Sequence, residues 1–261
     1  MENGKKMIPK VIHYCWFGPD PIPEYVKDNV ATWHEKCPGY EIRLWTNDNF
    51  DLEISPYVKS AVEHKKWAFV SDYARLYIIY ELGGIYLDGD VEVLQSLNPF
   101  LHYRMFTGLE DSDAIATGLI LGAVKQNQTL KKLMEIYDSQ GENLDSKGSF
   151  IERTCVELTT NYFREYGFKN KNIKQHVLDC TVFPTEYFCP QRPGTYKAKI
   201  TSSTYTVHHY SGSWLGEKGI KKRIKYRLIF VKAKIRKFLR VFIGTSNVEK
   251  LRKGYRKRFG H

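Results

Sequence analysis

The chain has 261 residues, of which 42% are hydrophobic, so it can bury the core of one domain with appendages. Its net charge of +11 is unevenly placed: residues 218–261 hold 17 of the 40 Lys and Arg and a single acid, whereas the remainder carries a net charge of −5. We therefore divide the chain into a mildly acidic body, residues 1–217, and a basic tail, residues 218–261, whose charge indicates an anionic partner.

The cysteines and the lack of long apolar runs exclude several classes of protein. Five cysteines, an odd number with no CxxC pair, indicate reduced thiols and argue against a disulfide framework or a zinc ribbon. The N-terminus leads into strand-like sequence without an apolar signal segment, and no run of about 18 apolar residues could span a bilayer. We expect a cytoplasmic protein that is not integral to a membrane.

Strand-like and helical segments alternate in the first part of the chain. Residues 10–17 are β-branched and aromatic and end at a Gly-Pro loop, which predicts a buried strand. A helix over 23–36 and a strand over 40–45 complete a βαβ unit, which predicts a parallel sheet with its ligand at the carboxyl ends of the strands. A helix over 67–82 and a strand over 85–87 continue the alternation. The predicted class is α/β with a central, mainly parallel sheet.

The second part of the body is less regular. A strand is predicted over 115–124 and helices over 128–137 and 150–166. Residues 175–209 are rich in Thr, Tyr, Pro and Val, which is typical of loops and short strands.

Two carboxylates, Asp88 and Asp90, follow the strand predicted over 85–87 and are separated by Gly89. In extended geometry, side chains two residues apart point to the same side, and paired carboxylates with room between them suit Mg²⁺ or Mn²⁺. The alternative is that this stretch is only a turn, which is the commoner role of an isolated Asp-Gly-Asp.

The preceding helix carries a second charged pair. Asp72 and Arg75 are three residues apart and share a helix face, where the alternative to a functional pair is an ordinary surface ion pair worth a few tenths of a kcal/mol. Aromatic and aliphatic residues flank this stripe, so we expect the pair to lie at a cleft.

Four ordered blocks then carry a resemblance. They are residues 12–18 (IHYCWFG), 68–75 (AFVSDYAR), 83–90 (GGIYLDGD) and 207–214 (VHHYSGSW). Together they resemble the glycosyltransferases of family 32, whose sugar-binding region contains a DXD motif. These enzymes act in capsule and O-antigen synthesis and in yeast mannan initiation, and the clostridial glucosylating toxins are distant relatives.

The resemblance implies a GT-A fold, a nucleotide-sugar donor and a divalent cation, Mn²⁺ or Mg²⁺. It implies four catalytic residues: Asp72 and Arg75 would hold the donor sugar and its phosphate, Asp88 would meet ribose or sugar hydroxyls, and Asp90 would ligate the metal. It also implies three donor-binding residues in the first blocks, with Trp16 stacked on the base and Ser71 and Tyr86 near the base and ribose.

The last block would complete the metal shell. By its resemblance to a His-Tyr-x-Gly pattern, His209 would be the second metal ligand, and Ser213 and Trp214 would contact the diphosphate. We expect His208 to face away, because neighbouring residues on a strand point to opposite sides. The alternative is a pair of ordinary edge-strand histidines.

The basic tail has its own pattern. An apolar stripe recurs at spacings of three and four among Lys and Arg, which predicts an amphipathic helix lying in an anionic membrane interface; it consists of Ile220, Ile224, Leu228, Val231, Ile235, Phe238 and Phe242. The alternatives are a helix packed on the body and a nucleic-acid contact, and the regular stripe argues against nucleic acid because phosphate contact needs none.

The combined prediction is a retaining, metal-dependent glycosyltransferase, peripheral on the inner face of the cell membrane. It would move a hexose from a nucleotide sugar, UDP-linked galactose, glucose or an N-acetylhexosamine, onto a lipid-linked saccharide of capsular polysaccharide or lipopolysaccharide synthesis. Two alternatives stay open: a toxin-like enzyme that modifies protein, and a non-catalytic module that binds membrane or nucleic acid.

Overall fold

A computed structural model describes residues 6–191 and 198–211. The basic tail lies outside the described residues, as do Ser213 and Trp214, so the predictions made for them stay predictions. None of the helices within the described ranges has the length and hydrophobicity needed to cross a bilayer.

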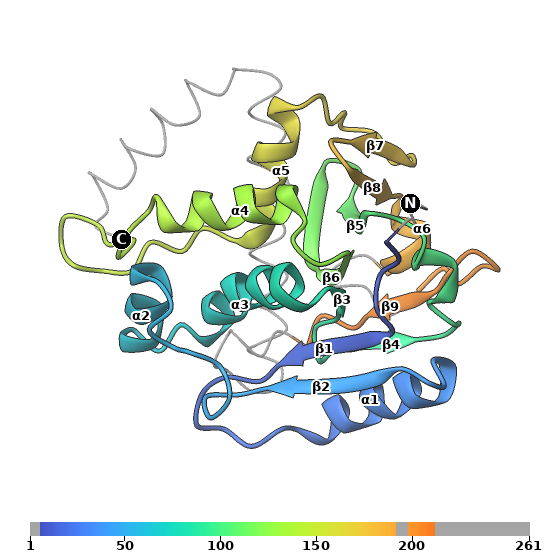
Figure 1. Ribbon diagram of the computed structural model, residues 1–261, viewed down its shortest axis with the longest axis horizontal. Helices are drawn as coiled ribbons and strands as arrows, with labels where there is room; N and C mark the ends of the chain where they lie inside the picture. The colour runs from blue at the N-terminus through green and yellow to red at the C-terminus, as the bar shows by residue number, and fades with distance from the viewer. Residues whose placement is uncertain (1–5, 192–197, 212–261) are drawn as a thin grey trace, which may run out of the picture. The chain divides into compact units, whose positions relative to one another are not determined.

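A seven-stranded sheet forms the centre, in the order β2-β1-β3-β6-β5-β8-β7 (Figure 1). Its strands, in chain order, are β1 Val11–Cys15, β2 Glu41–Trp45, β3 Gly84–Tyr86, β5 Met105–Asp111, β6 Ala114–Ala123, β7 Gln175–Val177 and β8 Cys180–Phe183. Strand β1 lies between β2 and β3, parallel to both, and β5 is parallel to β8. Strand β6 is antiparallel to both of its neighbours, and β7 is antiparallel to β8. Five strands therefore run in one direction, which confirms the mainly parallel sheet.

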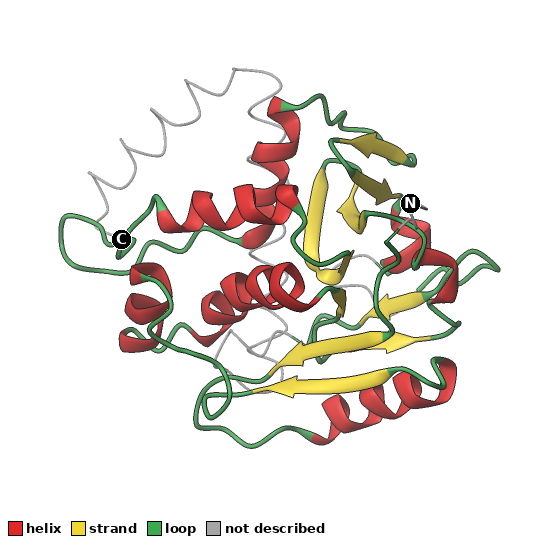
Figure 2. Cartoon of the chain, in the orientation of Figure 1, coloured by secondary structure: helices red, strands yellow, loops and turns green. Residues whose placement is uncertain are grey.

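Helices cover the sheet on both sides (Figure 2). They are α1 Glu24–Lys36, α2 Pro56–Glu63, α3 Trp67–Leu82, α4 Gln128–Asp138, α5 Cys155–Glu165 and α6 Thr185–Phe188, with a 3-10 turn, η1, at Asn98–Phe100. The side chains of α2 to α5 form one apolar core with residues of the sheet, whereas α1 and α6 contribute to a second core with Ile12 and Ile85. Successive side chains of a strand point to opposite sides of the sheet. Each side of the sheet therefore packs against its own layer of helices.

Two further strands form a small second sheet. Strand β4, Val91–Val93, pairs antiparallel with β9, Thr206–His208, and places His208 opposite Val91. This pairing joins segments more than 100 residues apart, and it brings the last described stretch next to the Asp88–Asp90 loop.

Most predicted elements are present with shifted ends. The helix predicted over 150–166 begins only at Cys155, because the Thr154 hydroxyl accepts a hydrogen bond from the Glu157 amide and caps it there. Helix α2 was missed although Ser55 caps it and Pro56 opens it, and β4 and β5 were missed as well. All five cysteines are free in the structure, four of them buried and Cys155 partly buried.

Candidate active site

The first part of the site is an ion network around a buried guanidinium. Arg75 of α3 places Nη1 2.9 Å from Asp72 Oδ1 and Nη2 3.0 Å from Asp88 Oδ1. The guanidinium also lies 4.9 Å above the ring of Tyr86, whose hydroxyl donates to Asp88 Oδ1 at 2.9 Å. The Arg75 side chain is 4% exposed, so Asp72 and Arg75 are no surface ion pair.

Burial and charge act against each other in this network. Burial raises the pKa of Asp72 and of Asp88, and the Arg75 charge opposes this rise in both. Burial alone would lower the pKa of Arg75, but Asp88, Tyr86 and Asp72 hold it well above its usual range. The guanidinium therefore stays charged and is shared between two carboxylates. Its Nε is buried and has no hydrogen-bond partner among the described residues.

The Asp-Gly-Asp stretch is a turn as well as a site. The Val91 amide donates to the Asp88 carbonyl at 3.0 Å, which closes a tight turn over 88–91, so the extended geometry predicted for the pair is wrong. The two carboxylates nevertheless face the same region: single ligand atoms of Asp88, Asp90 and His208 all lie within 4.8 Å of one another.

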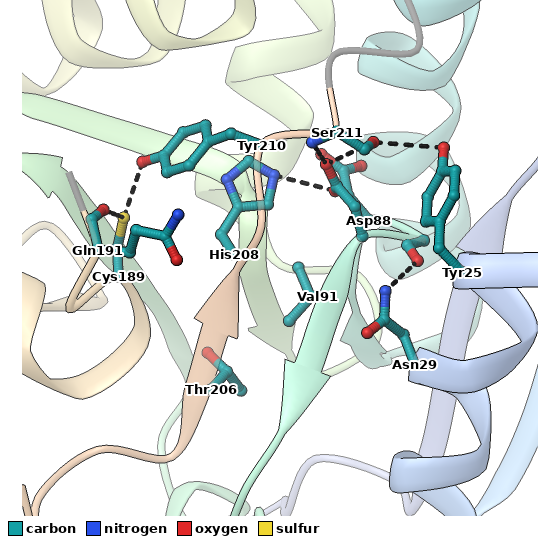
Figure 3. A network of polar contacts seen from close by, with 12 residues as sticks. Tyr25, Asn29, Asp88, Val91, Cys189, Gln191, Thr206, His208, Tyr210 and Ser211 are labelled. Carbon is teal, nitrogen blue, oxygen red and sulfur yellow. Dashed lines mark hydrogen bonds and ion pairs between the residues drawn. The ribbon is translucent and has the colours of Figure 1, made fainter. Parts of the chain in front are cut away.

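The second part of the site surrounds Asp90 (Figure 3). His208 Nε2 lies 3.0 Å from Asp90 Oδ1, and Ser211 donates to Asp90 Oδ2 from its amide at 2.8 Å and from its hydroxyl at 2.9 Å. Burial alone would raise the pKa of Asp90, but His208 and the Ser211 hydrogen bonds hold it well below its usual range. Burial alone would lower the pKa of His208, but Asp90, Asp88 and Glu110 raise it to about 9.

The structure brings His208, and not His209, to the two aspartates. His209 Nε2 lies 2.9 Å from Glu92 Oε2 instead. The structure thus agrees with the prediction that only one of the two histidines faces the aspartates, but that residue is His208, whereas the prediction was His209. The antiparallel register of β4 with β9 sets which face each residue of β9 occupies, and the sequence does not show that register.

Helix α1 holds the backbone of the turn. Asn29 Nδ2 donates to the Gly89 carbonyl at 2.9 Å, and Trp33 Nε1 donates to the Val91 carbonyl at 2.8 Å. A Cβ on Gly89 would come within 3.0 Å of the Val26 side chain, so the residue between the aspartates must be small for α1 to approach. Tyr25, at the start of α1, places its Oη 3.2 Å from Ser211 Oγ (Figure 3).

Gly118 of β6 lies against the other side of the ion network, and sequence reasoning missed it. A Cβ there would collide with Asp88 Oδ2 and would lie 3.0 Å from Asp88 Cγ and 3.2 Å from Arg75 Nη1. The Gly118 carbonyl also accepts from the Asp88 amide at 3.0 Å. A glycine inside an apolar strand pattern, as in residues 114–123, was the signal that a group approaches the backbone closely.

The predicted donor-binding residues are placed as follows. Trp16 comes directly after β1 and is partly buried, with its indole nitrogen donating to the Asp20 carbonyl at 2.8 Å. Ser71 lies on α3 beside Asp72, and its hydroxyl donates to the Trp67 carbonyl at 3.3 Å. Tyr86 is 1% exposed and is engaged with Asp88. The donor-binding roles of these three residues stay predictions.

The cluster of Asp88, Asp90 and His208 fits a divalent cation. Two carboxylates and an imidazole are common ligands of Mn²⁺, and the Ser211 hydroxyl beside them adds a further oxygen. His208 Nε2 lies 3.0 Å from Asp90 Oδ1, so the imidazole stands where it would share a bound cation with the two carboxylates.

The fold and the site together define a glycosyltransferase of the GT-A class. The solved structure named PaToxG Glycosyltransferase superposes with a TM-score of 0.50 at 17% identity, over 61% of this chain and 70% of that one, which shows the fold and confirms our prediction. A family model described as the glycosyltransferase sugar-binding region containing a DXD motif matches residues 23–107.

The chain belongs to this family of DXD-motif glycosyltransferases. A glycosyltransferase of Acanthamoeba polyphaga mimivirus is 33% identical over 186 residues, which cover 66% of this chain and 71% of the viral one. Inositol phosphoceramide mannosyltransferase 3 of Schizosaccharomyces pombe is 32% identical over 137 residues, which cover 51% of this chain. The match spans only 38% of the length of that mannosyltransferase.

Proposed function

We propose that the protein is a retaining, metal-dependent glycosyltransferase that moves a hexose from a nucleotide sugar to a lipid-linked saccharide. The observation that carries this proposal is that Asp88 takes part in both clusters. It pairs with Arg75 and also lies within 4.8 Å of ligand atoms of Asp90 and His208. A diphosphate and its sugar could therefore meet a guanidinium and a cation site at one place.

The residues have distinct roles in this proposal. Arg75 and Asp72 bind the sugar and the phosphate next to it, because the guanidinium offers fixed donors and the carboxylate accepts from sugar hydroxyls. Asp88, Asp90 and His208 would hold Mn²⁺ or Mg²⁺, which when bound supplies charge to the leaving diphosphate. Ser211 fixes the orientation of the Asp90 carboxylate.

Retention follows from a reaction on one face of the sugar. The bond between the anomeric carbon and the diphosphate oxygen breaks, the acceptor hydroxyl oxygen bonds to the same face, and its proton passes to the leaving phosphate. Preorganised charge at Arg75 stabilises the negative charge as it develops, which favours the transition state over the bound donor. Detection of a glycosyl adduct on a carboxylate by mass spectrometry would contradict this route.

The choice of donor and acceptor rests on the sequence and on the relatives. UDP-linked galactose, glucose and N-acetylhexosamine are the donors that we proposed from the resemblance, and the mannosyltransferase names of the yeast relatives add mannose. Those same names describe a lipid acceptor, inositol phosphoceramide. This supports a lipid-borne acceptor for the present chain, which the basic tail would meet at the inner face of the cell membrane during capsular or lipopolysaccharide synthesis.

A screen of nucleotide sugars for metal-dependent hydrolysis tests the enzymatic part. We expect one donor to be hydrolysed with Mn²⁺ or Mg²⁺, less so with EDTA, and Asp90→Ala to lose at least about 100-fold in rate. Glu142→Ala, which removes an exposed acid outside the site, is the matched control and should keep the wild-type rate. Full activity of Asp90→Ala would refute the assignment.

The acceptor needs its own assay. Radiolabelled sugar from the identified donor is offered to lipid-linked saccharide and, separately, to a protein extract. Incorporation into the organic phase supports the lipid-linked acceptor. Incorporation into protein alone would instead support the toxin-like alternative, and binding without hydrolysis or transfer would support the non-catalytic module.

A further inference from the structure

The segment that completes the metal cluster contains a residue in an unfavourable conformation. Tyr210 follows β9 and has a φ of 52°, in the left-handed region that L-residues with bulky side chains rarely adopt. Such a residue persists only where its surroundings hold it, and these residues concentrate at functional sites.

The left-handed turn changes which side chains face the site. On a regular strand, residues 208 and 211 are three apart and would point to opposite faces. In the structure both hold the same carboxylate: His208 reaches Asp90 Oδ1, and Ser211 reaches Asp90 Oδ2 twice. Tyr210 lies between them and supplies the change of direction, so its conformation is a condition for the arrangement around Asp90.

The hydroxyl of Tyr210 is anchored at a distance from the turn. Its Oη lies 2.8 Å from Cys189 Sγ (Figure 3). The same hydroxyl also hydrogen-bonds the Glu110 carboxylate. The Cys189 thiol is 3% exposed and lies 3.4 Å from the Gln191 carbonyl. Either the phenol or the thiol can donate in the contact between them, and the thiol can also donate to the Gln191 carbonyl.

The ring of Tyr210 connects this anchor to the histidine. It packs edge-on against the His208 ring, with centroids 4.2 Å apart and an angle of 60° between the planes. The Nδ1 atom of His208 is buried and has no hydrogen-bond partner among the described residues. A metal-binding histidine is usually oriented by a hydrogen bond to its second nitrogen. Here the orientation comes from ring packing instead.

We propose that Tyr210, anchored by Cys189 and Glu110, is a positioning residue that aims His208 and Ser211 at Asp90 and so sets the affinity of the cluster for a divalent cation. The inference rests on the proposed function, because it takes the cluster to be a metal site. The phenol oxygen and the thiol contact each other, and both act on Asp90 through the backbone turn and the His208 ring.

The physical consequence of losing the anchor is specific. Without the hydroxyl contacts, the unfavourable φ of Tyr210 is no longer compensated, and the segment can relax toward an extended backbone in which His208 and Ser211 cannot both reach Asp90. Asp88 and Asp90 themselves stay in place, because α1 and Gly118 hold their turn. Cation affinity should fall without vanishing, as expected when a group that orients a ligand is removed.

The test measures Mn²⁺ binding to the full chain by electron paramagnetic resonance, without donor or acceptor. We expect Tyr210→Phe, which keeps the ring and loses the hydroxyl, to weaken Mn²⁺ binding about 10-fold. The matched control is Tyr40→Phe, which removes another largely buried phenol hydroxyl, the one that donates to Asn98 at 3.1 Å outside the site. It should bind Mn²⁺ as the wild type does.

Two variants of Cys189 test the same contact from the side of the thiol. Cys189→Ala should weaken Mn²⁺ binding in the same direction, and Cys189→Ser, which restores a donor, should recover part of it. In donor hydrolysis, Tyr210→Phe should raise the Mn²⁺ concentration needed for half-maximal rate about 10-fold and leave the rate at saturating Mn²⁺ within about twofold of the wild type.

The possible results distinguish a failure of the positioning role from a failure of the metal site. Wild-type Mn²⁺ affinity in Tyr210→Phe, or in Cys189→Ala if the first variant does not fold, overturns the positioning role and leaves the metal site standing. A wild-type chain that binds no Mn²⁺ overturns the metal site of the proposed function, and the positioning role with it.

Discussion

Replacing Gly118 by alanine tests how tightly the ion network is fitted to the sheet. The added Cβ would collide with Asp88 Oδ2 and would come within 3.0 Å of Asp88 Cγ and 3.2 Å of Arg75 Nη1. The backbone of Gly118 cannot retreat easily, because its carbonyl accepts the Asp88 amide at 3.0 Å within the central sheet. The Asp88 carboxylate is therefore the group that must move.

The size of the effect follows from what the carboxylate would lose. Overpacking of this kind costs about 1–3 kcal/mol of folding stability. For a domain of this size that corresponds to a fall of roughly 2–12 °C in Tm. The carboxylate would be pushed from its contacts with Arg75 at 3.0 Å and Tyr86 at 2.9 Å. A displacement of about 1 Å in a catalytic group can reduce the rate about 100-fold, so kcat/KM should fall by that order.

The assay compares donor hydrolysis and thermal unfolding in two variants. Gly122→Ala, on the same strand, introduces a Cβ that would press on the Phe106 ring in the apolar core. It should lose stability but keep kcat/KM per folded molecule, whereas Gly118→Ala should lose both. A folded Gly118→Ala with kcat/KM within about twofold of the wild type would refute the idea that Asp88 is held at a fixed position for the reaction.

Two further predictions concern single side chains. Arg75→Lys keeps the charge but cannot reach Asp72 and Asp88 with two fixed donors, so kcat/KM for donor hydrolysis should fall at least about 100-fold, and a smaller loss would show that charge alone suffices. Burial lowers the pKa of His13 to about 4, and its Nδ1 accepts a hydrogen bond from Trp45 Nε1 at 3.1 Å. His13 is therefore protonated at a lower pH in the folded chain than in the unfolded chain. The free energy of unfolding should therefore fall by up to about 3 kcal/mol as the pH drops from 6.5 to about 4. The urea midpoint of His13→Gln should vary less over that range than the midpoint of the wild type. An equal pH dependence of the two midpoints would contradict this prediction.

The sequence predicted those parts of the site that depend on local order. Asp88 and Asp90 follow a strand, and Asp72 and Arg75 share a helical stripe, so their types and spacings were enough to place them together. The βαβ order at the start also predicted that their elements would meet at the carboxyl edge of a parallel sheet.

The parts that were missed depend on contacts between distant segments. The choice between His208 and His209 depends on how β9 pairs with β4 and on the left-handed turn at Tyr210. The residue types in this stretch do not predict that turn. Gly118 reaches Asp88 only because β6 inserts antiparallel beside β3, contrary to the simple alternation of parallel units. Periodicity along one segment contains no information on either pairing.

The question of whether Asp-Gly-Asp is a turn or a site is answered by the framework around it. The stretch is a tight turn, yet its backbone is held from three directions: Gly118 accepts the Asp88 amide, Asn29 donates to the Gly89 carbonyl, and the His209 amide donates to the Asp90 carbonyl at 2.9 Å. A solvated turn would leave these groups to water and let the two carboxylates separate to reduce their repulsion. Here backbone hydrogen bonds hold the turn, and Arg75 pairs with Asp88 while His208 pairs with Asp90. Such preorganisation distinguishes a site from a turn of the same sequence.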